Sequence, residues 1–185
     1  YDFLVNPVDL GSGGAGNNNA IGGSGGGAVI LTVGGTTTLD GLISANGNGG
    51  TGNYSGGGAG GTIHINSVNL NGTGALRVNG GNGNSTAGGG AGGRIAVNTS
   101  SSNNSDLNMT ANSARGNSVY AGAGTIYIND SGAARLIVSN GGNTADYQTL
   151  ISSDIAETNI LTIVSLNMMN ERLAFGNTVA TLITS

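Results

Sequence analysis

Few residues in this chain have side chains suited to acid, base or metal chemistry. The 185 residues include one His, no Cys and nine Asp or Glu. Structural and catalytic metal sites need three or four ligands, and His64 has no second His and no Cys to share an ion with. We therefore expect His64 to be a solvent-facing side chain, with no metal and no cofactor bound.

The carboxylates do not form a catalytic set. Enzymes that cleave acidic polysaccharides on β-helical folds need clustered carboxylates beside a basic group on one exposed sheet. Here no two carboxylates occupy matching positions in adjacent repeats. The sequence thus predicts no catalytic residue and no enzyme, and a carbohydrate-active enzyme of the lyase or hydrolase type stays as the less favoured alternative.

The charge balance bears on the partners. The chain has five basic residues and a formal net charge of −4. Proteins that bind the phosphate backbone of nucleic acids carry clustered Lys and Arg, so a nucleic-acid partner is not expected. No apolar run reaches the length of a membrane span, so no membrane span is expected either.

An internal repeat organises most of the sequence. An alternating tetrad follows a glycine-rich run four times, at residues 28–31, 62–65, 94–97 and 125–128. The first residues of the tetrads lie 34, 32 and 31 positions apart (62−28, 94−62 and 125−94). The second and fourth residues of each tetrad are aliphatic, as in a strand with one buried face. The inward positions are Val29, Leu31, Ile63, Ile65, Ile95, Val97, Ile126 and Ile128.

The composition indicates how such repeats pack. With 38 Gly and only 4% aromatic residues, the chain cannot fill a thick globular core. Disorder is the other outcome of such a composition, but the chain is 37% hydrophobic and its β-branched residues are clustered. Many thin layers that share one narrow core are therefore expected.

The sequence predicts an all-β fold, a right-handed parallel β-helix of about four coils of 31–34 residues with β-rich capping ends. We divide the chain into an N-terminal cap or partial coil (1–21), glycine-rich coils (22–147) and a glycine-poor C-terminal cap (148–185). Antiparallel hairpins are disfavoured because they would not require similar residues to recur at a fixed long spacing. A bundle of polyproline-like helices is disfavoured because the glycines show no strict three-residue period. A calcium-binding β-roll is disfavoured because the glycine runs lack Asp.

Two columns of outward or corner residues are candidate sites. Asn66, Asn98 and Asn129 follow three of the tetrads, and we predict that they stack as a structural amide ladder. His64 and Tyr127 occupy the third tetrad position and are flanked by Arg94, so an exposed ligand-binding patch that contacts a sugar weakly is a hypothesis. The simpler interpretation is that stacked outward positions vary freely.

The runs Gly88-Gly89-Gly90-Ala91-Gly92-Gly93-Arg94-Ile95-Ala96-Val97 and Ala123-Gly124-Thr125-Ile126-Tyr127-Ile128 resemble the glycine-rich repeats of very large bacterial cell-surface, adhesin-like proteins. The resemblance covers roughly residues 22–142. It implies an extracellular β-solenoid module without catalytic residues.

The function expected is that of a non-catalytic structural or adhesive β-solenoid module located outside the cell or on its surface. A self-assembling subunit of an extracellular filament is the first alternative, because uncapped solenoid ends can pair with a neighbour. Expected partners are a second copy at the solenoid ends and, weakly, a glycan.

Overall fold

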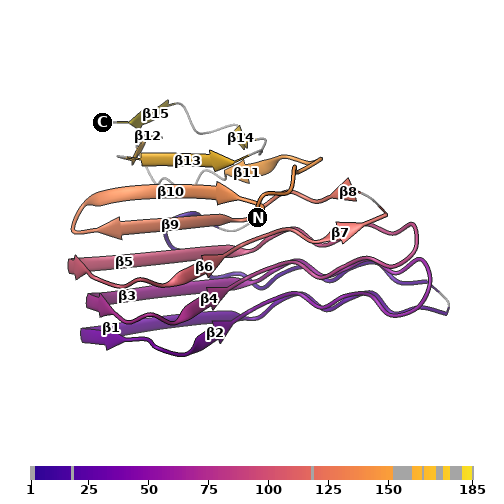
Figure 1. The fold of residues 1–185 in the computed structure, drawn as a ribbon, viewed down its shortest axis with the longest axis horizontal. Coiled ribbons are helices and arrows are strands. Elements are labelled where there is room, and N and C mark those ends of the chain that lie inside the picture. The colour runs from indigo at the N-terminus through magenta and orange to yellow at the C-terminus, as the bar shows by residue number, and fades with distance from the viewer. Residues whose placement is uncertain are drawn as a thin grey trace.

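A computed structural model of the chain describes residues 3–17, 19–117, 119–151, 160–163, 165–169, 173–175 and 181–184. Within these residues the protein is all-β and contains no helix (Figure 1). The strands are β1 Ala28–Thr38, β2 Leu42–Ser44, β3 Thr62–Asn71, β4 Ala75–Arg77, β5 Arg94–Asn103, β6 Asn108–Thr110, β7 Arg115–Gly116, β8 Val119–Tyr120, β9 Thr125–Asp130, β10 Ala133–Ser139, β11 Thr149–Ile151, β12 Ile160–Ile163, β13 Ser165–Met169, β14 Leu173–Phe175 and β15 Thr181–Thr184.

The chain winds as a β-solenoid of about three turns. One sheet has the order β1-β3-β5-β9-β10-β13, and its first four strands are parallel. A second parallel sheet has the order β2-β4-β6. The tetrads lie in register, so that Val29, Ile63, Ile95 and Ile126 form one column across adjacent strands. The predicted all-β parallel solenoid and the predicted aliphatic columns are confirmed, with about three turns where about four coils were expected.

The core lies between these two sheets. Ile63, Ile65, Ile95 and Val97 have no exposed surface, and they pack against Leu76 of the second sheet. Strands that stack directly on one another place the same position of each coil at about 4.8 Å from the next. A column of like aliphatic side chains therefore fills the core evenly, which is why the repeat needs little aromatic material.

The regular winding ends after β9. Ser131 and Gly132 adopt positive φ angles of 50° and 95°, and β10 then pairs with β9 in the antiparallel direction. Two consecutive residues with positive φ form the tight turn that antiparallel hairpins prefer. The amide of Gly132 donates to Asn129 Oδ1 at 3.0 Å, which closes the turn.

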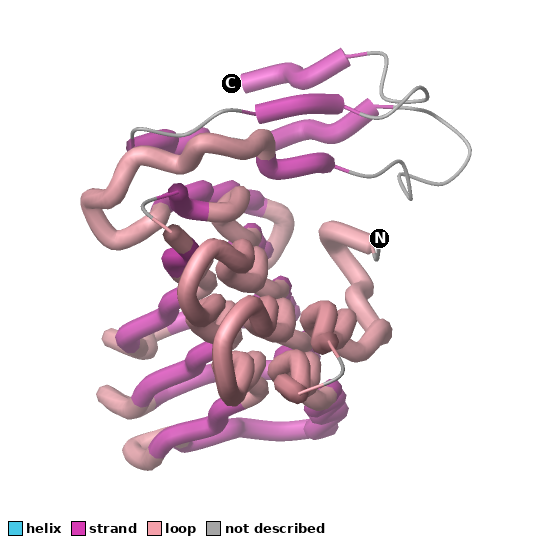
Figure 2. The backbone as a smooth tube through the Cα atoms, turned by 90° about the vertical axis from the view of Figure 1, so that its right-hand side faces the viewer, coloured by secondary structure: helices cyan, strands magenta, loops and turns pink. Residues whose placement is uncertain are grey.

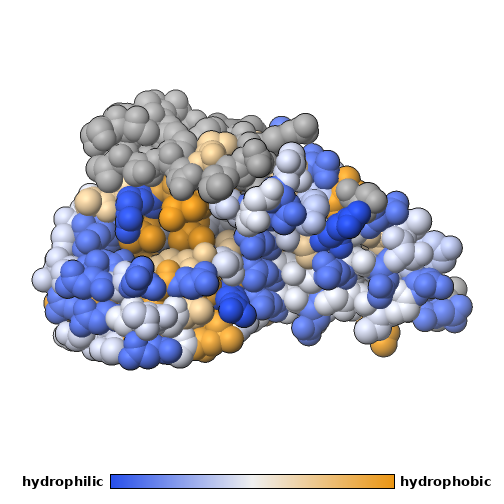
Figure 3. All heavy atoms as spheres, viewed as in Figure 1, coloured by the Kyte–Doolittle hydropathy of each residue, from blue (hydrophilic) through white to orange (hydrophobic). Residues whose placement is uncertain are grey.

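After this reversal the second sheet stops at β6, while the first continues through β10 to β13. The core opens there in a cleft of about 470 Å³ whose walls include Met109, Ile128 and Ile137. In Figure 3 a hydrophobic hollow interrupts the polar surface beneath the grey residues.

Hydrogen bonds connect the glycine-rich segments to one another with a period of three residues. In residues 56–61, amides three residues apart donate to the same neighbouring segment. Gly57 and Gly60 donate to carbonyls in residues 88–91, and Gly58 and Gly61 donate to carbonyls in residues 45–48. Gly56 and Ala59 donate to carbonyls in residues 12–15. A β-strand alternates with period two, whereas a polyproline II helix has three residues per turn. The glycine-rich segments therefore form a bundle of polyproline II-type helices, called the glycine bundle below. Figure 2 shows them nearly end-on as tight spirals.

The sequence argument against such a bundle was wrong, because the three-residue period is local. The pattern Gly-Gly-x-Gly-Gly recurs at residues 22–26, 57–61 and 89–93, so glycine occupies two of every three positions. A Cβ atom on Gly90 would fall on the carbonyl group of Gly58 in the coil below. Glycine is required where neighbouring backbones come this close.

Residues 3–10, called the strap below, lie across the outer face of the first sheet instead of closing an end of the stack. Leu4 is 2% exposed and packs in a second apolar cluster with Ala96, Tyr127 and Leu136. The carbonyl of Asp9 accepts a hydrogen bond from Thr62 Oγ1 at 2.8 Å. The strap thus buries the face of β3, β5 and β9 that the tetrads alone leave to solvent.

The predicted C-terminal cap falls partly outside the described residues. Within the described part of this segment, β11 pairs with β14 and β12 pairs with β15, and all of these pairs are parallel. β13 adds to β10 at the edge of the first sheet.

Candidate functional site

The predicted ligand patch is not an exposed column. The side chains of His64 and Tyr127 are aligned in one column with Ala96 between them, as expected. However, they are only 4% and 5% exposed, because the strap covers them. Burial raises the pKa of the Tyr127 hydroxyl, since the ionised form loses hydration. The expected solvent exposure of His64 and Tyr127 was therefore wrong, and Arg94 alone of the three reaches a solvent-lined surface.

The asparagine column forms one hydrogen-bonded rung. Asn66, Asn98 and Asn129 are in register on adjacent strands, and Asn98 Nδ2 donates to Asn66 Oδ1 at 3.0 Å. The Asn129 side chain instead accepts from Gly132 in the turn after β9. The ladder is thus confirmed between Asn66 and Asn98 and replaced by a turn contact at Asn129.

His64 belongs to the same polar cluster. Its Nε2 lies 3.1 Å from Asn66 Oδ1 and 3.2 Å from Asn98 Nδ2. Residues two apart on a strand share a face, so the spacing of His64 and Asn66 was the signal for this contact. The strap joins the cluster through the carbonyl of Val5, which lies 3.4 Å from Asn98 Nδ2. This arrangement is a buried structural network that fastens the strap.

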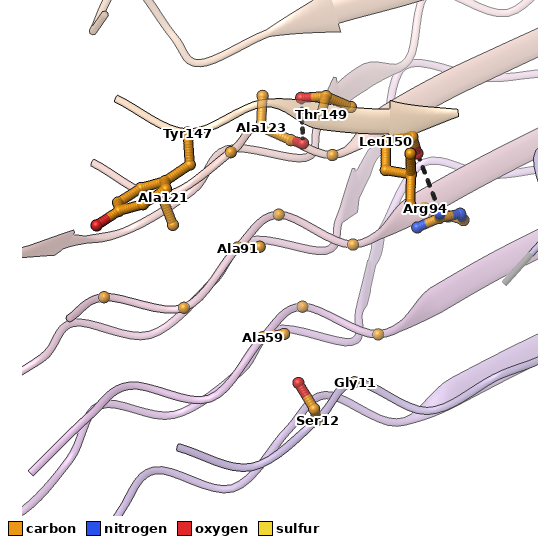
Figure 4. A pocket seen from close by; sticks show the side chains of 18 of the residues that line it. Gly11, Ser12, Ala59, Ala91, Arg94, Ala121, Ala123, Tyr147, Thr149 and Leu150 are labelled. Atoms are coloured by element: carbon orange, nitrogen blue, oxygen red, sulfur yellow. Dashed lines mark hydrogen bonds between the residues drawn. The ribbon is translucent and has the colours of Figure 1, made fainter. Parts of the chain in front are cut away.

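A groove of about 740 Å³ lies on the outer side of the glycine bundle. One rim is made by residues 9–12 and the other by residues 147–150, while the floor comes from residues 57–62, 89–94 and 121–124. Figure 4 shows the floor as stacked ribbons with Ala59 and Ala91 between the Ser12 rim and the Tyr147 rim. Sequence reasoning missed this groove because it did not place the glycine runs beside one another.

Some backbone polar groups beside the groove have no hydrogen-bond partner among the described residues, although their equivalents elsewhere in the bundle are paired. In the first coil the carbonyls of Gly23 and Gly26 accept hydrogen bonds from Gly14 and Gly11. One coil further, their equivalents are the carbonyls of Gly57 and Gly60, and these accept none within the part of the chain that the structure describes. The amide of Ala91 likewise donates to nothing there, although its equivalent in the second coil, Ala59, donates to Ser12.

One column of the bundle contains glycine where a rim segment packs against it and alanine where it faces the groove. In register, this column reads Gly25, Ala59, Ala91 and Gly122. A Cβ atom on Gly25 would fall on the carbonyl of Gly11, and one on Gly122 would lie 2.6 Å from the carbonyl oxygen of Gln148. Glycine therefore stands where a rim segment packs, and alanine stands where the groove is empty. The two methyl groups keep another backbone from packing at the same short distance.

The groove contains few charged groups. Arg94 is fixed at one end by a hydrogen bond from its guanidinium to the carbonyl of Leu150 at 3.5 Å, and Asp9 lies on the opposite rim. Tyr147 is 63% exposed and presents the aromatic ring of the lining. Among the described residues, no group of three or more His, Cys, Asp or Glu is placed to hold a metal ion. The chemistry that this surface offers is hydrogen bonding and apolar contact.

The described part of the chain also holds no helix of the length and apolar character that a membrane crossing requires. Comparison of the chain with protein-family models, with curated proteins and with solved structures finds no match.

Proposed function

We propose that this chain is a non-catalytic structural and adhesive module that works outside the cell or on its surface. The observation that carries the proposal is that neighbouring coils are joined by backbone hydrogen bonds along both the β-sheets and the glycine bundle. Such a stack resists bending and shear along its whole width, because no layer depends on a few side chains. A stiff support with a polar surface and few charged residues suits presentation and attachment.

The absence of Cys and the Gly- and Asn-rich composition agree with a bacterial surface location, and the resemblance to glycine-rich surface repeats supports the same proposal. The first test measures attachment and turnover together. The purified chain is coupled to beads, the beads are applied to immobilised polysaccharides, and the solution is assayed for new reducing ends and unsaturated uronates. Attachment without turnover is the expected result. Release of sugar products would establish the carbohydrate-active enzyme instead.

A filament subunit is the second candidate, and the open edge of β1 favours it. β1 is 11 residues long, forms the edge of the first sheet and contains no charged residue. Ile30 and Val33 on this strand are 50% and 36% exposed. Long uncharged edge strands tend to pair with another chain unless they are covered.

The filament candidate predicts association that depends on this edge. Light scattering at increasing concentration should show growing particles for the unmodified chain and monomers for the Ile30→Lys, Val33→Lys double variant. Ile21→Lys is the control, because Ile21 is 76% exposed and lies outside β1. Equal association by all three proteins would exclude the β1 edge as the contact.

A further inference from the structure

We propose that the groove over the glycine bundle binds a neutral glycan chain. This inference rests on the proposed adhesive function and names the ligand class and the site. The volume of about 740 Å³ falls within the range of about 300 to 1,000 Å³ typical of ligand sites.

The open backbone groups call for a ligand that both donates and accepts hydrogen bonds. At the floor of the groove the carbonyl of Gly92 has no donor and the amide of Ala91 has no acceptor among the described residues, and both residues are partly exposed. A sugar hydroxyl carries one donor and two acceptor lone pairs, so one type of ligand group serves both needs.

The apolar parts of the floor and rim favour a sugar over a peptide. The methyl groups of Ala59 and Ala91 occupy the positions where the rim segments require glycine, so a further glycine-rich strand cannot pack there at the distance used by residues 11–16. The exposed ring of Tyr147 offers a flat apolar surface, and the C–H face of a sugar ring packs well on such a ring.

The charge of the site favours a neutral glycan over an acidic one. Arg94 is the one basic residue in the lining, its guanidinium is engaged with the Leu150 carbonyl, and Asp9 lies across the groove. The whole chain carries a net charge of −4, which repels a polyanion at a distance.

The test is a titration of the isotope-labelled chain, followed by the amide NMR signals of Gly60, Ala91 and Gly92. The probes are neutral hexasaccharides (cellohexaose, hexa-N-acetylchitohexaose, mannohexaose and maltohexaose), an acidic hexagalacturonate, and the peptide Gly-Ser-Gly-Gly-Ala-Gly, which copies residues 11–16. We expect at least one neutral hexasaccharide to shift these signals in a saturable way. The peptide and the acidic probe should leave them unchanged.

Two variants test the location. Tyr147→Ala removes the ring and Ala91→Leu fills the groove, and each should weaken binding at least about tenfold. Tyr54→Ala is the matched control, because Tyr54 is 60% exposed and does not line the groove. Unchanged amide spectra away from the mutated position show that each variant is folded.

Three outcomes would overturn the proposal. Binding of the peptide in place of every sugar would identify a protein partner. A preference for the acidic probe would refute the charge argument. No saturable shift with any probe would remove the groove as a glycan site. If beads that carry the groove variants attach to a polysaccharide as well as beads that carry the unmodified chain, the adhesive function stands and its site lies elsewhere. If beads that carry the unmodified chain attach to no polysaccharide, the adhesive function itself is refuted.

Discussion

A pair of glycine substitutions two residues apart tests whether the glycine bundle holds the coils together. Gly90 and Gly88 belong to the same segment and both are glycine without a positive φ angle. In Gly90→Ala the new methyl group would fall on the Gly58 carbonyl, so the second and third coils must move apart. In Gly88→Ala the methyl group meets no atom within 4 Å.

The two substitutions should change the free energy of unfolding in opposite directions. Overpacking costs about 1 to 3 kcal/mol. The separation of the coils also weakens the bonds from Gly57 to Gly88 and from Gly60 to Ala91, each worth about 1 kcal/mol. Gly90→Ala should therefore lower the free energy of unfolding by about 2 to 4 kcal/mol, or the melting temperature by roughly 5 to 15 °C. Gly88→Ala should raise stability by about 0.4 to 1 kcal/mol, since alanine restricts the unfolded chain.

Urea unfolding followed by circular dichroism measures both changes under one set of conditions. Unfolding free energies that fall equally in the two variants would show that the period-three contacts do not stabilise the fold. A neutral Gly90→Ala would show the same.

Further predictions concern the core, the strap and its polar network. Ile95→Ala should cost about 2 to 5 kcal/mol because Ile95 has no exposed surface, whereas Ile30→Ala, at a residue 50% exposed, should cost far less in the same unfolding assay. Asn98→Ala should cost about 1 to 3 kcal/mol, since it removes the contacts of the Asn98 amide with Asn66 and the His64 ring, and the exposed Asn104 serves as the control; a cost no larger than that of Asn104→Ala would contradict the rung. Burial raises the pKa of Tyr127 above its usual 10.0, so the folded state holds this proton more tightly and stability should fall as pH rises from 10 through the raised pKa. Tyr127→Phe should flatten that part of the pH profile, and an unaltered profile would show that Tyr127 ionises as freely in the folded as in the unfolded protein.

The parts of the fold that could be predicted are those with a local signal. Aliphatic residues at the second and fourth tetrad positions, repeated at near-constant spacing, were enough to predict parallel coils and the columns through Ile63 and Ile95. The column of Asn66 and Asn98 followed from the same spacing. The turn residues Asp130, Ser131 and Gly132 were present in the sequence, but they were not interpreted as the point where the winding reverses.

The remaining features depend on contacts between distant residues. His64 and Tyr127 occupy outward positions of their strands, and distant segments such as the strap, more than 50 residues away in sequence, make these positions interior. The glycine bundle was missed because the Gly-Gly-x-Gly-Gly pattern of each run lasts only five residues before a β-strand follows. The groove depends on both features, since the strap leads into one of its rims and the bundle makes its floor.

The backbone pairing of the glycine bundle also gives its residues two different roles. At two of every three positions no side chain fits, while positions such as Ala59 and Ala91 project outward with room for change. These outward positions recur at about 9.3 Å along each polyproline II helix and at about 4.8 Å from one coil to the next. The main chain of the bundle thus fixes a regular array of outward positions, and the side chain at each position can be changed one residue at a time. Substitutions at these positions change the chemistry of the surface and leave the backbone hydrogen bonds of the bundle in place.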